Sequence, residues 1–252
     1  MTENHNIIPA RHIHEECGVF GIFTPQEADV ASYAYYALYS LQHRGQESAG
    51  IVVNDDGLFR SLRDTGLVSE VFPPEQLKSL GKGTIAVGHV RYGTTGSDNK
   101  RNVQPILVNH FKGRMALAHN GNLTNSRELR QELESRGSIF QTTTDSEVIA
   151  YIIVQERLNR GSIEEAVSAA MDRIEGAYSL VLSSPTKLIA ARDPHGFRPL
   201  CMGHLKDGSV VFASESCALD AIGAEFERDI RPGEIVVVDT AGVRSDTSHC
   251  AK

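Results

Sequence analysis

The chain contains 252 residues, of which 40% are hydrophobic and 23% are charged, and its formal net charge at pH 7 is −7. A chain of this length can bury a large core, and we expect one domain rather than two small ones. Lysine and arginine are scattered without a basic run, which argues against nucleic-acid and anionic-membrane partners, because both need clustered cations. We therefore expect a soluble enzyme that acts on small molecules.

The N-terminal leader shows no export signal. Residues 1–16, MTENHNIIPARHIHEE, lack the apolar segment of a secretory signal, and no apolar run approaches the roughly 18–20 residues that span a bilayer. We expect a cytoplasmic protein. The leader histidines His5, His12 and His14 have no partnering cysteine or carboxylate geometry, so we expect them to be solvated.

The cysteine pattern indicates reduced thiols. No two cysteines form a C-x-x-C pair, and export is not expected, so neither a disulfide framework nor a zinc knuckle is indicated. The cysteines of the chain are Cys17, Cys201, Cys217 and Cys250. We assign no metal to this chain.

The first half of the chain is predicted to be mainly β-structure with one early helix. A strand at 17–23 is followed by apolar residues at helical spacing from Val30 to Leu41, which predict a helix that ends near Gly45. Apolar runs bounded by turn residues predict further strands at 50–54, 58–63, 84–90, 106–110 and 115–119. The strand at 84–90 leads into a glycine-rich loop at 93–97.

The apolar period changes after residue 125. Three helices are predicted from Leu129 and Leu133 before Gly137, from the apolar positions 148–153 behind Thr144-Asp145, and from the capping box Ser162-x-x-Glu165. Strands are predicted again at 178–183, 187–192, 199–204, 210–213 and 234–238. Many antiparallel strands with helices segregated between them favour an α+β fold, with two sheets sandwiched by helix layers.

Cys17 opens the apolar run CGVFGIF directly behind the polar leader. If the bond before it is cut, one residue carries both a thiol (pKa ~8.5) and an α-amine (pKa ~7.7–8.0), so nucleophile and general base lie together. The structural alternative is a small apolar residue that starts a buried strand.

Five motifs follow one another along the chain. They are CGVFG at 17–21, LQHRGQESAG at 41–50, HVRYGTTG at 89–96, HNGNLTN at 119–125 and TDSE at 144–147. Together they resemble the glutamine amidotransferase domain of the N-terminal-nucleophile class (class II), most closely that of the amidophosphoribosyltransferase family, over residues 16 to about 243. The resemblance implies a four-layer αββα sandwich with two mainly antiparallel sheets.

The resemblance also implies an activity and its residues. Cys17 would hydrolyse the side-chain amide of glutamine to glutamate and ammonia, with Asn120 and Gly121 binding the oxyanion. Arg91 and Asp145 would hold the α-carboxylate and the α-ammonium group of glutamine. A surface salt bridge for Arg91 and a helix N-cap for Asp145 are the structural alternatives.

Two further segments have implied roles beside the nucleophile. Arg44 and Gly45 would orient the thiol and the amine, although Arg-Gly after a helix is also an ordinary C-cap. The segment at 193–200, DPHGFRPL, is predicted to be a structural turn that presents Arg198. His89 and His119 are expected to be core histidines beside the site rather than bases.

The leader is expected to be a propeptide. Resemblance to the subclass whose propeptide ends at the nucleophile implies cleavage between Glu16 and Cys17, by attack of the Cys17 thiol on the Glu16 carbonyl. The expected organisation is therefore a leader at 1–16 and a glutaminase domain at 17–252. A disordered tail that stays in place is the alternative.

The complete enzymes of this family also have a phosphoribosyltransferase domain, which we expect to be absent from this chain. That domain uses phosphoribosyl pyrophosphate and Mg²⁺ to form 5-phosphoribosylamine, the first committed step of purine synthesis, and many relatives carry a 4Fe-4S iron–sulfur cluster and form homotetramers. We expect this chain to hold neither cofactor and to show glutaminase activity at most. The run VVVDTAG at 236–242 is predicted to be a core strand, because it lacks the second acid and the Gly-Thr pair of a phosphoribosyl-binding loop.

Two other functions remain open from the residues. A hexosamine-forming amidotransferase typically has Tyr after Arg-Gly and Trp after the carboxylate-binding Arg, whereas this chain has Gln46 and Tyr92 and no Trp. A catalytically silent interaction module would keep the fold without the activity.

Overall fold

A computed structural model of the chain describes residues 16–92 and 100–250. The leader residues 1–15 and the glycine-rich loop expected at 93–97 lie outside the described residues. Of the described helices, none is both long and apolar enough to cross a membrane.

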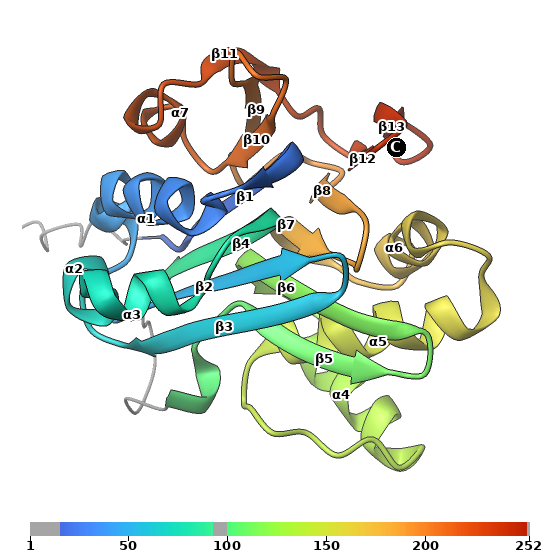
Figure 1. Cartoon of the computed structure of the whole chain (residues 1–252). Helices are drawn as coiled ribbons and strands as arrows, with labels where there is room; N and C mark the ends of the chain where they lie inside the picture. The colour runs from blue at the N-terminus through green and yellow to red at the C-terminus, as the bar shows by residue number, and fades with distance from the viewer. Residues whose placement is uncertain (1–15, 93–99, 251–252) are drawn as a thin grey trace, which may run out of the picture.

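The strands of the described residues form two antiparallel sheets (Figure 1). The first sheet contains, in spatial order, β11 (Glu225–Asp229), β9 (Cys201–His204), β10 (Val210–Ala213), β1 (Gly18–Ala28), β4 (Gly83–Arg91), β2 (Ser48–Asp55) and β3 (Leu58–Thr65). The second contains β13 (Gly242–Asp246), β12 (Ile235–Asp239), β8 (Leu188–Arg192), β7 (Gly176–Ser183), β6 (Gly113–Leu123) and β5 (Ile106–His110).

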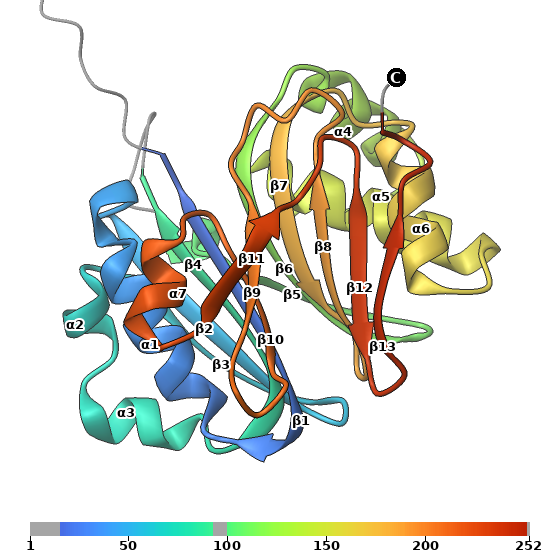
Figure 2. The ribbon, with the colours of Figure 1, turned by 90° about the horizontal axis from the view of Figure 1, so that it is seen from above.

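Helices cover the outer face of each sheet, as Figure 2 shows. Those outside the first sheet are α1 (Val30–Ser40), α2 (Val68–Val71), α3 (Pro74–Ser79) and α7 (Cys217–Ala221). Those outside the second are α4 (Ser126–Ser135), α5 (Asp145–Asn159) and α6 (Ile163–Met171). This arrangement confirms the expected α+β, four-layer αββα sandwich.

Four buried apolar clusters of the described residues hold the layers together. The larger of the two between the sheets includes Val19, Val87 and Phe212, and the smaller joins Val52 and Phe59 to Ala116. The other two lie between each sheet and its helices. Because both faces of the central strands are covered, these strands are continuous apolar runs rather than alternating ones. The first seven residues of β1 are accordingly all buried.

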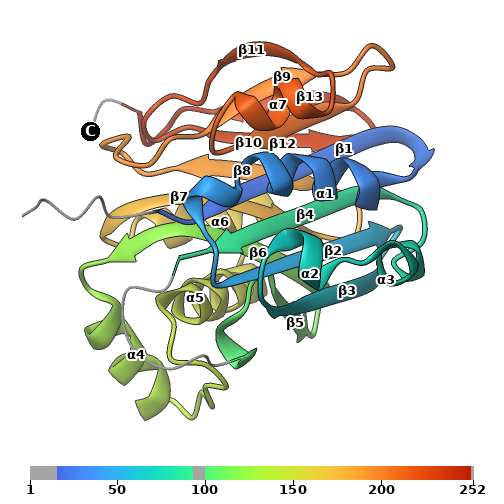
Figure 3. The same ribbon diagram turned by 90° about the vertical axis from the view of Figure 1, so that its left-hand side faces the viewer.

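Strand register places the expected nucleophile beside the expected carboxylate-binding arginine. β1 runs antiparallel to its neighbour β4 (Figure 3), and Gly18 pairs with Val90. Cys17, just before β1, and Arg91, the last residue of β4, therefore lie at the same end of the sheet. β6 belongs to the second sheet and packs against β1 and β4 of the first. It runs on to Leu123, beyond the expected end at 119, and so carries Asn120 and Gly121 to that end.

The structure corrects several local expectations. Asp145 is not the N-cap of its helix: Thr144 is, and Asp145 is the first helical residue. Gly45 does not end α1 as a left-handed cap, because α1 ends at Ser40 and Gly45 has an extended backbone after the 3-10 turn η1 (Gln42–Arg44). The Ser162 hydroxyl does accept from the Glu165 N–H, but the Glu165 carboxylate accepts from the Gly161 N–H, so the capping box is incomplete.

Candidate active site

A cavity of about 550 Å³ opens where β1, β4, β6 and the start of α5 meet. Six of the expected site residues line this cavity: Glu16, Cys17, Arg91, Asn120, Gly121 and Asp145. Arg44 and Gly45 do not line it, and each contacts one of the lining residues from behind.

Cys17 lines the cavity beside Glu16. Burial raises the pKa of its thiol, although a hydrogen bond from the Tyr92 main chain and the positive charges of Arg91 and Arg44 act in the opposite direction. A thiol with a raised pKa is mostly protonated near pH 7. A nucleophilic role for Cys17 would therefore require a base that takes the thiol proton.

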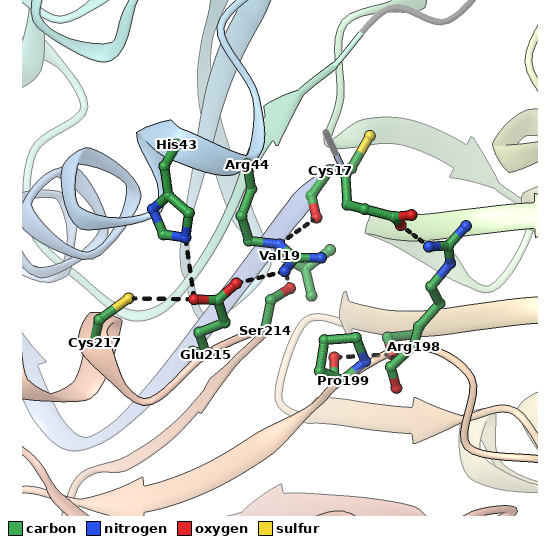
Figure 4. A network of polar contacts seen from close by, with 12 residues as sticks. Cys17, Val19, His43, Arg44, Arg198, Pro199, Ser214, Glu215 and Cys217 are labelled. Carbon is green, nitrogen blue, oxygen red and sulfur yellow. Dashed lines mark hydrogen bonds and ion pairs between the residues drawn. The ribbon is translucent and has the colours of Figure 1, made fainter. Parts of the chain in front are cut away.

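Arg44 fixes the main chain of Cys17. Its Nε donates to the Cys17 carbonyl oxygen at 3.0 Å, and its guanidinium forms an ion pair with Glu215 (Figure 4). Next to Glu215, Ser214 accepts a hydrogen bond from the Val19 N–H at 2.9 Å and returns one to the Val19 carbonyl at 3.0 Å. The turn after β10 thus holds the first residues of β1 in place.

Gly45 is required by a close main-chain approach. A Cβ on this residue would lie 2.6 Å from the carbonyl carbon of Arg91. The Glu47 N–H donates to the Arg91 carbonyl oxygen at 3.0 Å in the same segment. The loop after η1 therefore packs directly on the end of β4 and sets the position of Arg91.

The Arg91 guanidinium is a largely buried cation. Its side chain is 14% exposed, and its Nη1 lies 3.7 Å from a Glu47 carboxylate oxygen, too far for a hydrogen bond. Within the described residues Nη1 has no hydrogen-bond partner. Arg91 does form an ion pair, with Glu47, but the pair is largely buried rather than on the surface. At 3.7 Å it leaves Nη1 without a hydrogen bond, so the guanidinium can still bind a planar anion such as a carboxylate.

Asn120 and Gly121 lie near the end of β6 and have unusual environments. The Asn120 Nδ2 is buried and, among the described residues, has no hydrogen-bond partner. Gly121 has φ of +142°, and a Cβ there would lie 2.0 Å from the Ala177 carbonyl oxygen. Glycine at this position lets β6 pass close to β7. The side-chain amide of the preceding residue, Asn120, lines the cavity without a hydrogen-bond partner for its Nδ2 among the described residues.

Asp145 is oriented by contacts with β6. One carboxylate oxygen accepts the Leu123 N–H at 2.9 Å, and the other lies 3.6 Å from the Nδ1 of His119. At that distance the second oxygen is not hydrogen-bonded to His119, so it can accept from a ligand in the cavity. Asp145 thus provides an anion in the cavity without capping its helix.

The two histidines beside the site are buried and uncharged at neutral pH. Burial lowers the pKa of His89 to about 3, and it also lowers the pKa of His119 against the raising effect of Asp145. His89 contacts the His119 carbonyl oxygen at 3.1 Å, and His119 contacts the Ser146 hydroxyl at 3.0 Å. A group with a pKa near 3 is a poor general base at pH 7, which agrees with a structural role.

Sequence reasoning missed one residue and one contact that support the site. It did not identify Glu215, the partner of Arg44, and it did not predict the ion pair between Arg198 and Glu16. Each pair joins residues more than 170 positions apart, and no local pattern links them. The turn at 193–200 does present Arg198, as expected, and the Asp193 carboxylate closes it by accepting from His195 and Phe197.

One group of side chains has the spacing of metal ligands. The ligand atoms of His43, Glu215 and Cys217 lie within 4.8 Å of one another (Figure 4). Glu215 is already paired with Arg44 and His43, so ion pairing accounts for the grouping. The mixed nitrogen, oxygen and sulfur set does not suit Mg²⁺, and its single cysteine does not fit the four thiolates of a 4Fe-4S cluster.

Residues 89–221 match the family model described as "Glutamine amidotransferase domain". The curated protein "Amidophosphoribosyltransferase 2, chloroplastic" of Arabidopsis thaliana is 49% identical over 231 residues, which cover 91% of this chain and 40% of that protein. The amidophosphoribosyltransferase of Bacillus subtilis is 44% identical over 235 residues, covering 93% of this chain and 48% of that protein. The chain thus spans somewhat less than half the length of these relatives.

A solved structure has the same architecture. The glutamine phosphoribosylpyrophosphate (PRPP) amidotransferase of B. subtilis, complexed with ADP and GMP, superposes with a TM-score of 0.83 at 43% sequence identity. The match covers 91% of this chain and 49% of that chain.

Proposed function

Because the chain belongs to the glutamine amidotransferase domain family, we propose that it hydrolyses the side-chain amide of glutamine with Cys17 as the nucleophile. The observation that supports this most strongly is the buried, unpartnered Asn120 Nδ2 in the same cavity as the Cys17 thiol. An unsatisfied buried donor costs about 1–3 kcal/mol. An oxyanion formed at Cys17 would satisfy it.

The reaction follows from the thiol and the amine of one residue. The Cys17 sulfur attacks the amide carbon, the Cys17 α-amine takes the thiol proton and passes it to the departing nitrogen, and ammonia leaves. Water then hydrolyses the thioester to glutamate and restores the thiol. Asn120 Nδ2 and the Gly121 N–H stabilise the oxyanion in both steps.

Arg91 and Asp145 would bind the other end of glutamine. The Arg91 fork lines the cavity with an Nη1 that makes no hydrogen bond to a described residue, and it suits the α-carboxylate. The Asp145 carboxylate lines the same cavity and suits the α-ammonium group. Together these charges distinguish glutamine from a simple amide. Arg44 and Gly45 act through Cys17 and Arg91 by fixing their main chains.

The amine becomes available when the leader is removed. We propose that the Cys17 thiol attacks the Glu16 carbonyl carbon, so that a C–S bond forms, the C–N bond breaks and the Cys17 nitrogen takes a proton. Water hydrolyses this thioester, which releases residues 1–16 and leaves the free thiol and amine.

In the complete enzyme, we propose that the ammonia is transferred to phosphoribosyl pyrophosphate to give 5-phosphoribosylamine. The names of the relatives support this branch over hexosamine formation. The acceptor, its Mg²⁺ and any iron–sulfur cluster would then bind in the part of the relatives that this chain does not cover. A homotetramer is proposed for the complete enzyme by the same resemblance.

Ammonia release from glutamine tests the proposed activity. The protein should release ammonia, the Cys17→Ala variant should not, and the Cys250→Ser variant, which changes a thiol outside the cavity, should match the parent. Equal ammonia release by the Cys17→Ala variant would refute the role of Cys17. No release by a correctly processed parent would support the silent-module alternative.

A further inference from the structure

Arg198 is a rigidly mounted cation at the edge of the cavity. Its main-chain N–H donates to the Asp193 carboxylate at 3.3 Å, and its carbonyl oxygen accepts from Arg192 Nε at 2.7 Å and from the Ser179 hydroxyl at 3.2 Å. The main chain of Arg198 is therefore fixed by β7, by β8 and by the turn that follows β8. The side chain is only 20% exposed.

The guanidinium of Arg198 faces the residue before the nucleophile. It forms an ion pair with the Glu16 carboxylate, and its Nε is buried without a hydrogen-bond partner among the described residues. Burial lowers the pKa of Arg198, since a cation loses hydration there, so the position favours an adjacent anion. Glu16 is the acid that the described structure provides.

The Glu16–Cys17 peptide is thus held on both sides. Figure 4 shows Arg44 and Arg198 on either side of Cys17. Arg44 binds the Cys17 carbonyl oxygen on the amine side of the bond, and Arg198 binds the Glu16 side chain on the acyl side. Fixing both residues reduces the conformational freedom of the bond that the thiol has to attack.

We propose that Arg198 is a positioning residue for removal of the leader, which recognises the Glu16 carboxylate and orients the Glu16–Cys17 bond for attack by the Cys17 thiol. The inference rests on the proposed self-cleavage. Arg198 takes no part in the bond changes: it holds the carboxylate until the thioester is hydrolysed, and then releases it with the leader.

The test follows cleavage of the full chain directly. The protein is made by cell-free synthesis, samples are stopped at intervals, and intact mass gives the fraction that has lost residues 1–16. A partly exposed ion pair contributes about 1 kcal/mol, or roughly fivefold in rate. We therefore expect Arg198→Gln and Glu16→Gln each to slow cleavage about fivefold. Glu15→Gln removes the same charge one residue earlier and should cleave at the parent rate.

Combined variants separate recognition from a general structural effect. If the two side chains act on each other, the Arg198→Gln, Glu16→Gln double variant should be no slower than either single variant. The variant with the exchanged pair, Arg198→Glu with Glu16→Arg, should cleave at no less than half of the parent rate. Thermal unfolding of each variant shows whether it is folded, and if Arg198→Gln does not fold, Glu16→Gln against Glu15→Gln decides the result.

The outcomes are distinguishable from failure of the proposed function. A parent chain that stays at full length overturns the self-cleavage and this inference with it. A parent that cleaves while Arg198→Gln and Glu16→Gln cleave equally fast overturns the role of Arg198 alone. Effects that multiply in the double variant would also overturn it, because they would mean that the two residues act independently.

Discussion

Asn120 Nδ2 and Arg91 Nη1 are buried nitrogens that point to a ligand, because neither has a hydrogen-bond partner in the described residues. Native proteins satisfy most buried donors, and exceptions often mark functional sites. The two donors differ in kind: a neutral amide near the nucleophile suits an oxyanion, and a guanidinium suits a carboxylate. Their separate chemistry matches the two ends of a glutamine molecule.

We predict that Asn120→Ala lowers kcat for glutamine hydrolysis about 10²- to 10³-fold, with a smaller change in KM, because one oxyanion donor is lost. The control is Asn109→Ala, which removes the same side chain from an exposed position on β5. Steady-state ammonia release checks both variants. A kcat for Asn120→Ala within threefold of the parent would contradict the assignment.

Residue types were easier to identify from the sequence than their contacts. The motifs pointed to Cys17, Arg91 and Asn120, which the structure places around one cavity. Glu215 gave no such signal, since its role depends on a contact with Arg44 that is 171 positions away. Long-range pairs of this kind are set by the sheet order, which a single sequence does not reveal.

The β6–β7 pair sets the position of the proposed oxyanion site. Gly121 lies opposite Tyr178 in this pair, and its backbone passes close to Ala177. A side chain at residue 121 would meet a backbone oxygen, which cannot move without shifting β7. The geometry of the site therefore depends on one glycine in a strand interior.

We predict that Gly121→Ala destabilises the protein by about 3 kcal/mol or more, since it combines backbone strain with a main-chain clash. The control is Gly208→Ala: Gly208 also has a positive φ, +87°, but a Cβ there meets nothing within 4 Å. That variant should lose about 1 kcal/mol. Urea unfolding measures both, and equal losses would show that the clash is unimportant.

Elements with buried faces were predictable, and short or exposed ones were not. The expected strands at 84–90 and 178–183 correspond to β4 and β7, which are almost wholly buried. Neither β11 nor β13 was predicted, because their residues are mostly exposed edge positions without an apolar pattern. The helices α2 and α7, with four and five residues, are too short to show helical periodicity.

The molecule as a whole has two histidines that stay neutral in its core, so its stability should depend on pH. Folding holds the pKa of His89 near 3, against an ordinary value of about 6.5. As pH falls below about 6.5, the unfolded chain binds a proton that the folded protein excludes. Stability is therefore present above pH 6.5 and is lost progressively toward pH 3.

We predict that the free energy of unfolding falls by about 2 kcal/mol between pH 7 and pH 5 from His89 alone. His119 acts in the same direction. Urea unfolding at both pH values should show a fall that is about 2 kcal/mol smaller in His89→Gln. If the parent and the variant share the same pH dependence, His89 does not carry this effect.

The most direct test of the account joins the covalent state of the chain to its activity. Intact mass and ammonia release are measured on the same samples of the protein as cleavage proceeds. We predict that activity rises in proportion to the fraction of chains that begin at Cys17, because the free amine of Cys17 is the base for its own thiol. Full glutaminase activity in a chain that still carries residues 1–16 would contradict the account.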